Sequence, residues 1–382
     1  MPQAYKALAP RTIQLPEGGD AILIEGKKPV PVNYIDLRSG KSDEEWSPLG
    51  ATFEGIAGLG SAEERLKEQD ADGIGAEILF PNMESGPVLW RTIADDEAYR
   101  ATVRAYNDWV LQDYASVAPD RLVPMVVLPW TGVADAIAEM ERCAKLGAHG
   151  IVLGVFPSGK GYPTPEDDAF WAAATSIRMP ITIHFGIDRS GPRAFQPVFE
   201  YPAASDEVMK KVRREHLAFI LTGFGLAPAL NMTQLILSGV FDRFPSLRIF
   251  FAETRIGWVP FWSETADYWY ERHRHWNERL LGFRPVERKP SEYVRDRILM
   301  SVHAIENVGM ELRHHFAPDA LLFATDFPHI ECEWPNTRRF ADAFFAKVPA
   351  ADAFRIGAGN MLDFFRLRET KVGQAVLAAR PT

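Results

Sequence analysis

Short, continuous apolar runs recur along this chain and alternate with stretches of helical pattern. A run without regular polar interruptions is typical of a parallel strand that is covered on both faces. The alternation of such runs with helices predicts an α/β chain built around a parallel sheet. We count seven runs, one fewer than a closed eight-stranded barrel requires, at 76–81, 122–128, 150–154, 181–184, 248–253, 297–302 and 321–325.

The stretches between these runs have the spacing of amphipathic helices. Segment 133–146 is the clearest, because Ile137, Met140 and Ala144 share one face and Gly147 stands at the C-terminal end. Further helices are predicted at 99–115, 167–177, 209–219, 233–241, 263–281 and 307–316. Since no segment has the composition of a linker, we expect one distorted barrel over 61–370. We also expect an arm or hairpin over 1–60, a helical insertion over 263–296 and a tail over 371–382.

Side chains with acid–base and metal-binding chemistry stand at the ends of three apolar runs. His184 ends one run, Glu253 ends another, and Asp326 follows the run at 321–325. The carboxyl ends of parallel strands meet at one mouth of a barrel, so we expect these three side chains to lie close together. Imidazole and carboxylate groups bind Zn²⁺, Fe and Mn. The pattern therefore predicts a divalent metal site with one or two ions, in which Asp326 and Glu253 also transfer protons.

Two more histidines extend the predicted ligand set. His303 follows the run at 297–302, and His329 lies three residues after Asp326. Each candidate ligand also has a purely structural interpretation, because polar residues at strand ends are often only hydrogen-bonded. His329, for example, follows a proline and can simply hold its loop.

Three residues are candidates for substrate contact. Arg255 can bind a carboxylate through two hydrogen bonds, and Trp258 and Trp334 can line an aromatic pocket. The alternatives are an ion pair between Arg255 and a neighbouring acid, and ordinary packing for the two tryptophans.

The composition excludes several classes of partner. A net charge of −9 without a stripe of Lys and Arg argues against a nucleic-acid partner. No apolar stretch approaches the length of a membrane span, and the first residues do not form a signal sequence. The two cysteines, Cys143 and Cys332, cannot form a disulfide framework. We therefore expect a cytoplasmic enzyme with a small-molecule substrate, and a homodimer because the stretch 268–288 is rich in aromatic residues.

The order of several motifs resembles the amidohydrolase-2 family of metal-dependent TIM-barrel enzymes. That family includes non-oxidative decarboxylases related to aminocarboxymuconate semialdehyde decarboxylase. The resemblance implies a distorted (β/α)8 TIM barrel with its metal site at the carboxyl mouth. The motifs are AYNDW at 105–109, PDRL at 119–122, LGAHG at 146–150, PITIH at 180–184, GVFDRFP at 239–245, AETRIGWVP at 252–260, DFPH at 326–329 and WPN at 334–336.

The chain departs from the family pattern in two places. The first strand of relatives carries an Asp-x-His type motif, whereas the strand-like run here, 32–37, is followed by Arg38. We therefore expect the first strand to be missing or replaced, or to be supplied by residues upstream of Met1. The decarboxylases also place a histidine where this chain has Glu253, which weakens the expectation of decarboxylation.

Three functional classes remain open at this point. The resemblance implies hydrolysis or non-oxidative decarboxylation of a small to medium carboxylate, amide, ester or lactone, with a metal-activated water as the hydrolytic nucleophile. The His/Glu/Asp set without the first-strand pair also fits a nonheme iron or diiron monooxygenase. The third class is a metal-free, inactive barrel. Metal content and dependence on O₂ distinguish the three.

Overall fold

The structure is a computed structural model that forms two compact units. Unit 1 contains Met1–Val123, Arg189–Phe224 and Thr325–Phe340, and unit 2 contains Pro124–Asp188, Gly225–Ala324 and Ala341–Thr382. The predicted helix at 209–219 and residues 33–38 lie outside the described residues. Those described are 1–16, 18–32, 42, 44–47, 50–54, 56–187, 226–316, 318–329 and 331–380.

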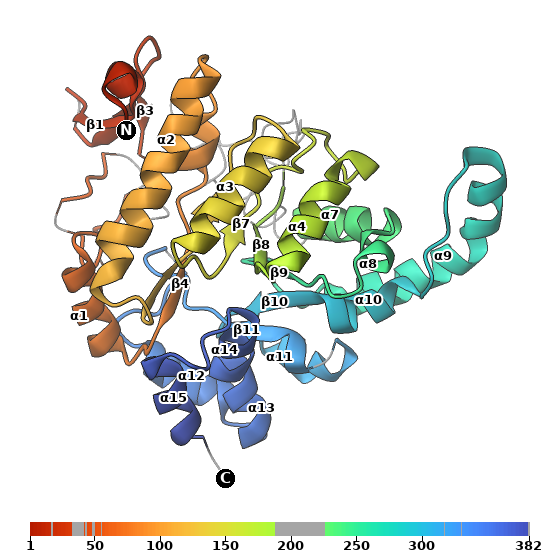
Figure 1. Cartoon of the computed structure of the whole chain (residues 1–382). Helices are drawn as coiled ribbons and strands as arrows, with labels where there is room; N and C mark the ends of the chain where they lie inside the picture. Colours follow the sequence, from red (N-terminus) through yellow and green to blue (C-terminus); the bar gives the residue numbers. More distant parts are fainter. Residues whose placement is uncertain are drawn as a thin grey trace, which may run out of the picture. The chain divides into compact units, whose positions relative to one another are not determined.

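The core of unit 2 is a parallel sheet, which contains six strands among the described residues, in the order β11-β10-β9-β8-β7-β6 (Figure 1). Neighbours in the sheet are consecutive in the chain, and Ile249 pairs with both Ile181 and Ile298. Almost every strand residue is buried, which explains why the apolar runs show no alternation. The strands are β6 (Val126–Val127), β7 (Ile151–Val152), β8 (Ile181–His184), β9 (Ile249–Ala252), β10 (Ile298–Val302) and β11 (Leu321–Phe323).

Helices follow the strands along unit 2. The helix predicted at 133–146 is α3, which buries Ala136, Met140 and Cys143. The predicted helical insertion is formed by α9 and α10. The helices are α3 (Val133–Lys145), α4 (Asp168–Ser176), α7 (Leu226–Leu237), α8 (Val240–Arg243), α9 (Val259–Leu281), α10 (Pro290–Arg297), α11 (Asn307–Glu311), α13 (Ala350–Phe354), α14 (Asn360–Phe364) and α15 (Lys371–Ala378), and α12 (Thr337–Phe345) runs from unit 1 into unit 2.

Unit 1 begins with a three-stranded antiparallel sheet, which lies in the segment predicted as an arm or hairpin. Helix α1 starts at a capping box, in which the Glu64 N–H donates to Ser61 Oγ and the Ser61 N–H donates to Glu64 Oε2. It ends at Gly73, whose φ of 75° suits glycine. The elements are β1 (Arg11–Gln14), β2 (Asp20–Leu23), β3 (Val30–Pro31), α1 (Ala62–Asp72), β4 (Glu77–Leu79), α2 (Asp96–Asp108) and β5 (Leu122–Pro124).

The seven predicted runs all contain strands, with one difference in detail. The run at 122–128 is divided into β5, which pairs with β4, and β6, which pairs with β7. Pro124, which has no N–H to donate to a ladder, is the last residue of β5, and the run is interrupted directly after it, at Met125. The strands of the described residues do not close into a barrel. The domain limits at 60 and 370 remain predictions, and the predicted tail contains α15, whose start is capped by Thr370.

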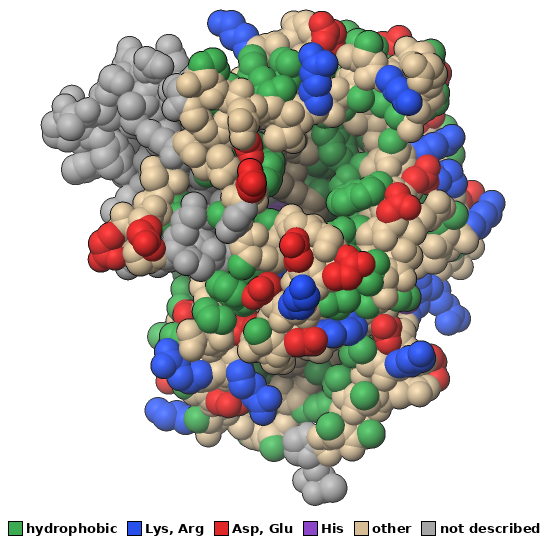
Figure 2. All heavy atoms as spheres, turned by 90° about the vertical axis from the view of Figure 1, so that its left-hand side faces the viewer, with side chains coloured by type: hydrophobic (Ala, Val, Ile, Leu, Met, Phe, Trp, Pro, Cys, Tyr) green, Lys and Arg blue, Asp and Glu red, His purple; other side chains and the backbone are tan. Residues whose placement is uncertain are grey.

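Within the described residues, no helix combines the length and the apolar character needed to cross a membrane. On the face drawn in Figure 2, Lys and Arg side chains are interspersed with Asp and Glu side chains.

Candidate metal site at the carboxyl ends of the strands

The carboxyl ends of β8 and β9 bring together two of the predicted ligands. His184 is the last residue of β8 and pairs in register with Ala252, directly before Glu253. His184 Nε2 lies 2.9 Å from Glu253 Oε1, and both side chains are largely buried. Two ligand atoms bound to one Zn²⁺ ion are also about 3 Å apart, so this pair has a spacing that fits a shared metal.

The backbone after these strands is held in an uncommon conformation. Phe185, Glu253 and Arg255 have φ values of 61°, 56° and 56°, in the left-handed region that favours glycine. Hydrogen bonds hold two of them, because the Phe185 N–H donates to the Ala252 carbonyl at 2.9 Å and the Glu253 N–H donates to Ser301 Oγ at 2.7 Å. Such a residue costs about 1–3 kcal/mol, and such residues cluster at functional sites. The strain therefore supports a functional role for this edge of the sheet.

A half-buried carboxylate, Glu306, which the sequence analysis missed, joins the loops after β9 and β10. Glu306 Oε1 accepts from the Ile256 N–H at 2.7 Å, and its Oε2 accepts from the His303 N–H at 2.9 Å. Burial raises the pKa of Glu306, and the two backbone donors and Arg255 partly oppose that rise. Glu306 thereby connects the segment that carries Glu253 and Arg255 to His303. Its only sequence signal is an acid three residues after His303.

Glu306→Gln is expected to destabilise unit 2 by about 1–3 kcal/mol, because the amide group can accept only one of the two backbone donors and leaves the other buried N–H unsatisfied. Urea unfolding monitored by circular dichroism measures the change. Glu311→Gln, at an exposed position of α11, is the matched control and should stay within about 0.5 kcal/mol of the parent. An unchanged unfolding midpoint for Glu306→Gln would show that the carboxylate does not hold the two loops.

Two further predicted ligands, Asp326 and His329, lie in unit 1, in the segment that follows β11 along the chain. Asp326 also has a positive φ, 61°, and its carbonyl accepts from the His329 N–H at 2.8 Å. The next residue, Phe327, lies under the guanidinium of Arg65, which is 3.6 Å from the ring centroid. Phe327 also packs edge-on against Trp334, with 6.0 Å between the ring centroids. The turn that carries Asp326 and His329 is thus anchored on the interior of unit 1.

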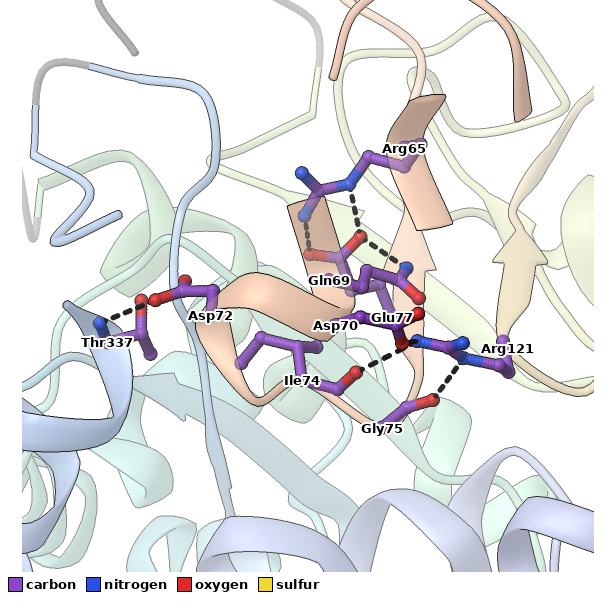
Figure 3. A network of polar contacts seen from close by, with 9 residues as sticks. All are labelled: Arg65, Gln69, Asp70, Asp72, Ile74, Gly75, Glu77, Arg121 and Thr337. Atoms are coloured by element: carbon purple, nitrogen blue, oxygen red, sulfur yellow. Dashed lines mark hydrogen bonds and ion pairs between the residues drawn. The ribbon is translucent and has the colours of Figure 1, made fainter. Parts of the chain in front are cut away.

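Arg65 belongs to a polar network that the sequence analysis did not anticipate (Figure 3). It is 4% exposed, and its Nε donates to Glu77 Oε2 at 2.8 Å, while its Nη2 pairs with Glu77 Oε1. Gln69 Nε2 donates to the same Glu77 oxygen at 2.8 Å. At the end of α1, Asp72 accepts from the Thr337 N–H at 2.7 Å. The network ties α1 and β4 to the segment that contains Asp326.

Arg65→Met is expected to lower the free energy of unfolding by about 3–5 kcal/mol, because it leaves Glu77 buried without its cation. The double variant Arg65→Met/Glu77→Met should recover most of that loss, since it removes both charges. Chemical denaturation measures both effects. Arg11→Met is the control, since Arg11 and Glu25 form an exposed pair worth about 0–1 kcal/mol. Equal losses in the single variant and the control would refute a structural role for the buried pair.

Three other predicted site residues, His303, Trp258 and Trp334, differ in their surroundings. His303 is buried, with 6% exposure. The indole N–H of Trp258 donates to the Thr254 carbonyl at 2.8 Å, so it supports its own turn. The indole N–H of Trp334 is buried and has no hydrogen-bond partner among the described residues, which suits a contact with a polar substrate. The substrate contacts of Arg255, Trp258 and Trp334 remain predictions, as do the metal ligands.

Comparison with known proteins decides the family. The sequence model of one family, amidohydrolase-2, matches residues 61–367. The chain belongs to this family. A curated relative, a gamma-resorcylate decarboxylase from Polaromonas sp. strain JS666, is 26% identical over 346 residues, which cover 85% of this chain and 92% of the relative. The protein is therefore an enzyme of the metal-dependent hydrolases and lyases that form the amidohydrolase superfamily.

Solved structures confirm the predicted class of fold. An amidohydrolase from Mycobacterium avium subsp. paratuberculosis is 17% identical, covers 96% of this chain and 94% of its own, and has a TM-score of 0.68. A dihydroxybenzoic acid decarboxylase from Polaromonas sp. JS666, crystallised with manganese and the inhibitor 2-nitroresorcinol, is 22% identical with a TM-score of 0.60. It covers 81% of this chain and 87% of its own. The fold is thus a distorted barrel of the TIM class, although the described strands do not close it.

Proposed function

We propose that this amidohydrolase-family enzyme catalyses the metal-dependent, non-oxidative decarboxylation of an aromatic carboxylate. The observation that carries the proposal is the close pair of His184 and Glu253 at the carboxyl ends of β8 and β9. The similarity to a gamma-resorcylate decarboxylase supports it. This pair supplies metal-binding groups where the family's fold has its site.

The available side chains fit a divalent cation. His184 and Glu253 would hold it, with His303 as a further candidate. Asp326 and His329 are the two other ligands that the sequence predicts. Carboxylate oxygen atoms suit Mn²⁺, and imidazole nitrogen atoms suit Zn²⁺ and Fe²⁺, so the donor set favours no metal outright. The manganese in a solved relative supports Mn²⁺. When bound, the ion supplies positive charge to the oxygen atoms of the substrate.

The proton chemistry would be performed by the chain itself. The carboxyl group of Asp326, or that of Glu253, would give its proton to the ring carbon that carries the carboxylate. The bond between that carbon and the carboxylate would then break, its electron pair would restore the aromatic ring, and CO₂ would leave. Solvent returns one proton to the acid in each cycle. Arg255, Trp258 and Trp334 would orient the substrate through its carboxylate and its ring.

Hydrolysis is the second candidate, because Glu253 stands at the position where we expect a histidine in the decarboxylases of this family. In that case Glu253 or Asp326 would accept a proton from the water that attacks an ester, amide or lactone, and a bound metal would make that water more acidic. The same residues serve both reactions, so only the products distinguish them.

In the decisive experiment, the metal content of the purified protein is measured first. The protein is then incubated with 2,6-dihydroxybenzoate and with 5-carboxyvanillate in the absence of O₂. Release of CO₂ together with the matching phenol is the expected result. Turnover only in the presence of O₂, with iron in the protein, would favour the oxygenase alternative. Turnover of lactones or esters with no release of CO₂ would favour hydrolysis. Metal-free, inactive protein would refute decarboxylation, oxygenation and hydrolysis, and would favour the inactive barrel.

The partners of the enzyme, its location and its oligomeric state are also proposals. A small-molecule substrate agrees with the decarboxylase relatives, and the net charge of −9 supports the absence of a nucleic-acid partner. A cytoplasmic location and a homodimer remain predictions.

A further inference from the structure

Two arginines stand at the amino ends of β9 and β10, the ends of these strands that point away from the candidate metal site. Arg248 directly precedes β9, and Arg297 directly precedes β10. The first residues of the two strands, Ile249 and Ile298, are paired in register. Since neighbouring strands lie about 4.8 Å apart, the two arginines start close together (Figure 1). We call them the arginine pair.

The guanidinium groups of the arginine pair lie partly inside unit 2 without the partners that such groups need. The Nε–H groups of Arg248 and Arg297 are buried, and neither has a hydrogen-bond partner among the described residues. Both side chains are half-buried, and that of Arg297 is 22% exposed. Buried polar groups are nearly always hydrogen-bonded, and arginine is rarely buried unless it is paired. The partly exposed tips of the two side chains are the groups that a ligand from solution can reach.

The acidic residues near Arg248 are already occupied by other arginines. Arg288 donates to both carboxylate oxygens of Asp296, at 2.8 and 3.2 Å, whereas Arg297 reaches that carboxylate only at 3.7 Å. Two more aspartates near Arg248 are also paired, so the positive charge of the arginine pair is left without a carboxylate of its own. The three occupied pairs are Arg288 with Asp296, Arg355 with Asp319 and Arg368 with Asp363.

The electrostatics of Arg248 agree with an uncompensated charge. Burial lowers the pKa of Arg248, the positive charge of Arg297 lowers it further, and the three aspartates partly oppose that shift. The charged form of Arg248 is therefore less stable here than in water. The whole chain carries a net charge of −9, so a concentration of unbalanced positive charge is a local feature of this end of the sheet. An anion bound to both guanidinium groups would offset their repulsion.

From these observations we propose that the arginine pair is a binding site for the phosphate group of a small molecule. Two planar guanidinium groups can donate hydrogen bonds to several oxygen atoms of one phosphate, and a phosphate dianion balances both positive charges. A carboxylate offers two oxygen atoms and one charge, so it matches the pair less well. The site uses none of the residues of the proposed reaction, and the inference does not depend on that reaction.

The test measures the binding of two probes, inorganic phosphate and glycerol 3-phosphate, by isothermal titration calorimetry at constant ionic strength. The parent protein should bind at least one of them, and the stronger probe shows whether free phosphate or a phosphate monoester is preferred. Arg248→Met and Arg297→Met should each weaken binding by about tenfold or more, because each removes charged hydrogen bonds to the phosphate. Arg295→Met, at an exposed position of α10, is the matched control and should leave the affinity unchanged.

Urea unfolding separates a binding role of Arg248 from a structural one. Without phosphate, Arg248→Met should unfold at the same urea concentration as the parent or at a higher one, because methionine keeps much of the packing and removes a charge that has no partner. Added phosphate should raise the unfolding midpoint of the parent and of Arg295→Met, since it binds the folded state, and should leave that of Arg248→Met unchanged.

Four outcomes would overturn the proposal. The first is a parent protein that binds neither probe at millimolar concentration. The second is equal weakening in Arg248→Met and Arg295→Met, which would show an unspecific attraction to positive charge. The third is binding that His184→Ala abolishes and Arg248→Met retains, because the phosphate would then bind at the proposed metal site. The fourth is a lower unfolding midpoint of Arg248→Met without phosphate, which would show that Arg248 serves the fold.

Discussion

His184→Ala is expected to remove the bound divalent metal and to lower turnover by at least about 100-fold, because even the loss of a side chain that only supports a metal ligand costs about 10–100-fold. The side chain stands at the open end of β8 and not within the packed sheet, so the fold should persist. Metal content by plasma mass spectrometry, turnover and circular dichroism measured on the same preparation separate the loss of metal from the loss of fold.

One further variant tests the second proposed ligand, and another serves as the control. Glu253→Gln replaces the group 2.9 Å from His184 with a neutral amide, and it should weaken metal binding in the same direction. His275→Ala changes an exposed histidine on α9 and should retain full metal content and full turnover. If His184→Ala retained its metal and its activity, the proposed site at the ends of β8 and β9 would be wrong.

Asp326→Asn is expected to lower turnover by about 10²–10⁴-fold, which is the range that a positioned acid or base contributes. The amide group cannot deliver the proton that the ring carbon needs, and it is a poorer ligand for a divalent cation. The turn itself should survive, because Phe327 and Arg65 anchor it and asparagine tolerates the positive φ of this position.

The pattern of the loss identifies the role of Asp326. Loss of turnover with retained metal would assign it to proton transfer, whereas loss of both would assign it to the metal ligands. Asp113→Asn, an exposed carboxylate of unit 1, is the matched control and should be neutral. Full turnover and full metal content in Asp326→Asn would refute the proposed site.

The parallel sheet could be predicted from the sequence because its signal is local. Each of the seven apolar runs contains a strand, since the side chains of a strand covered on both faces must be apolar at nearly every position. The interruption of the run at 122–128 has a local cause as well, the missing N–H of Pro124. The departure of the first strand from the family pattern stays a prediction, because residues 33–38 lie outside those that the structure describes.

The candidate site could be predicted only in part. A polar residue directly after a buried run indicates a strand end, which is why His184, Glu253 and Asp326 stood out. The pattern could not indicate Glu306 or Arg65, because nothing local distinguishes these charged residues from ordinary surface ones. Their roles depend on partners far along the chain, such as Ile256 for Glu306 and Phe327 for Arg65.

The sequence by itself determined the class of fold, the family and the residues that stand at the strand ends, because apolar periodicity and motif order are properties of neighbouring residues. Only the tertiary structure decided that His184 and Glu253 meet, that Glu306 holds two loops and that Arg248 starts beside Arg297. These features depend on which distant segments pack together, and on the burial and the backbone strain that this packing imposes.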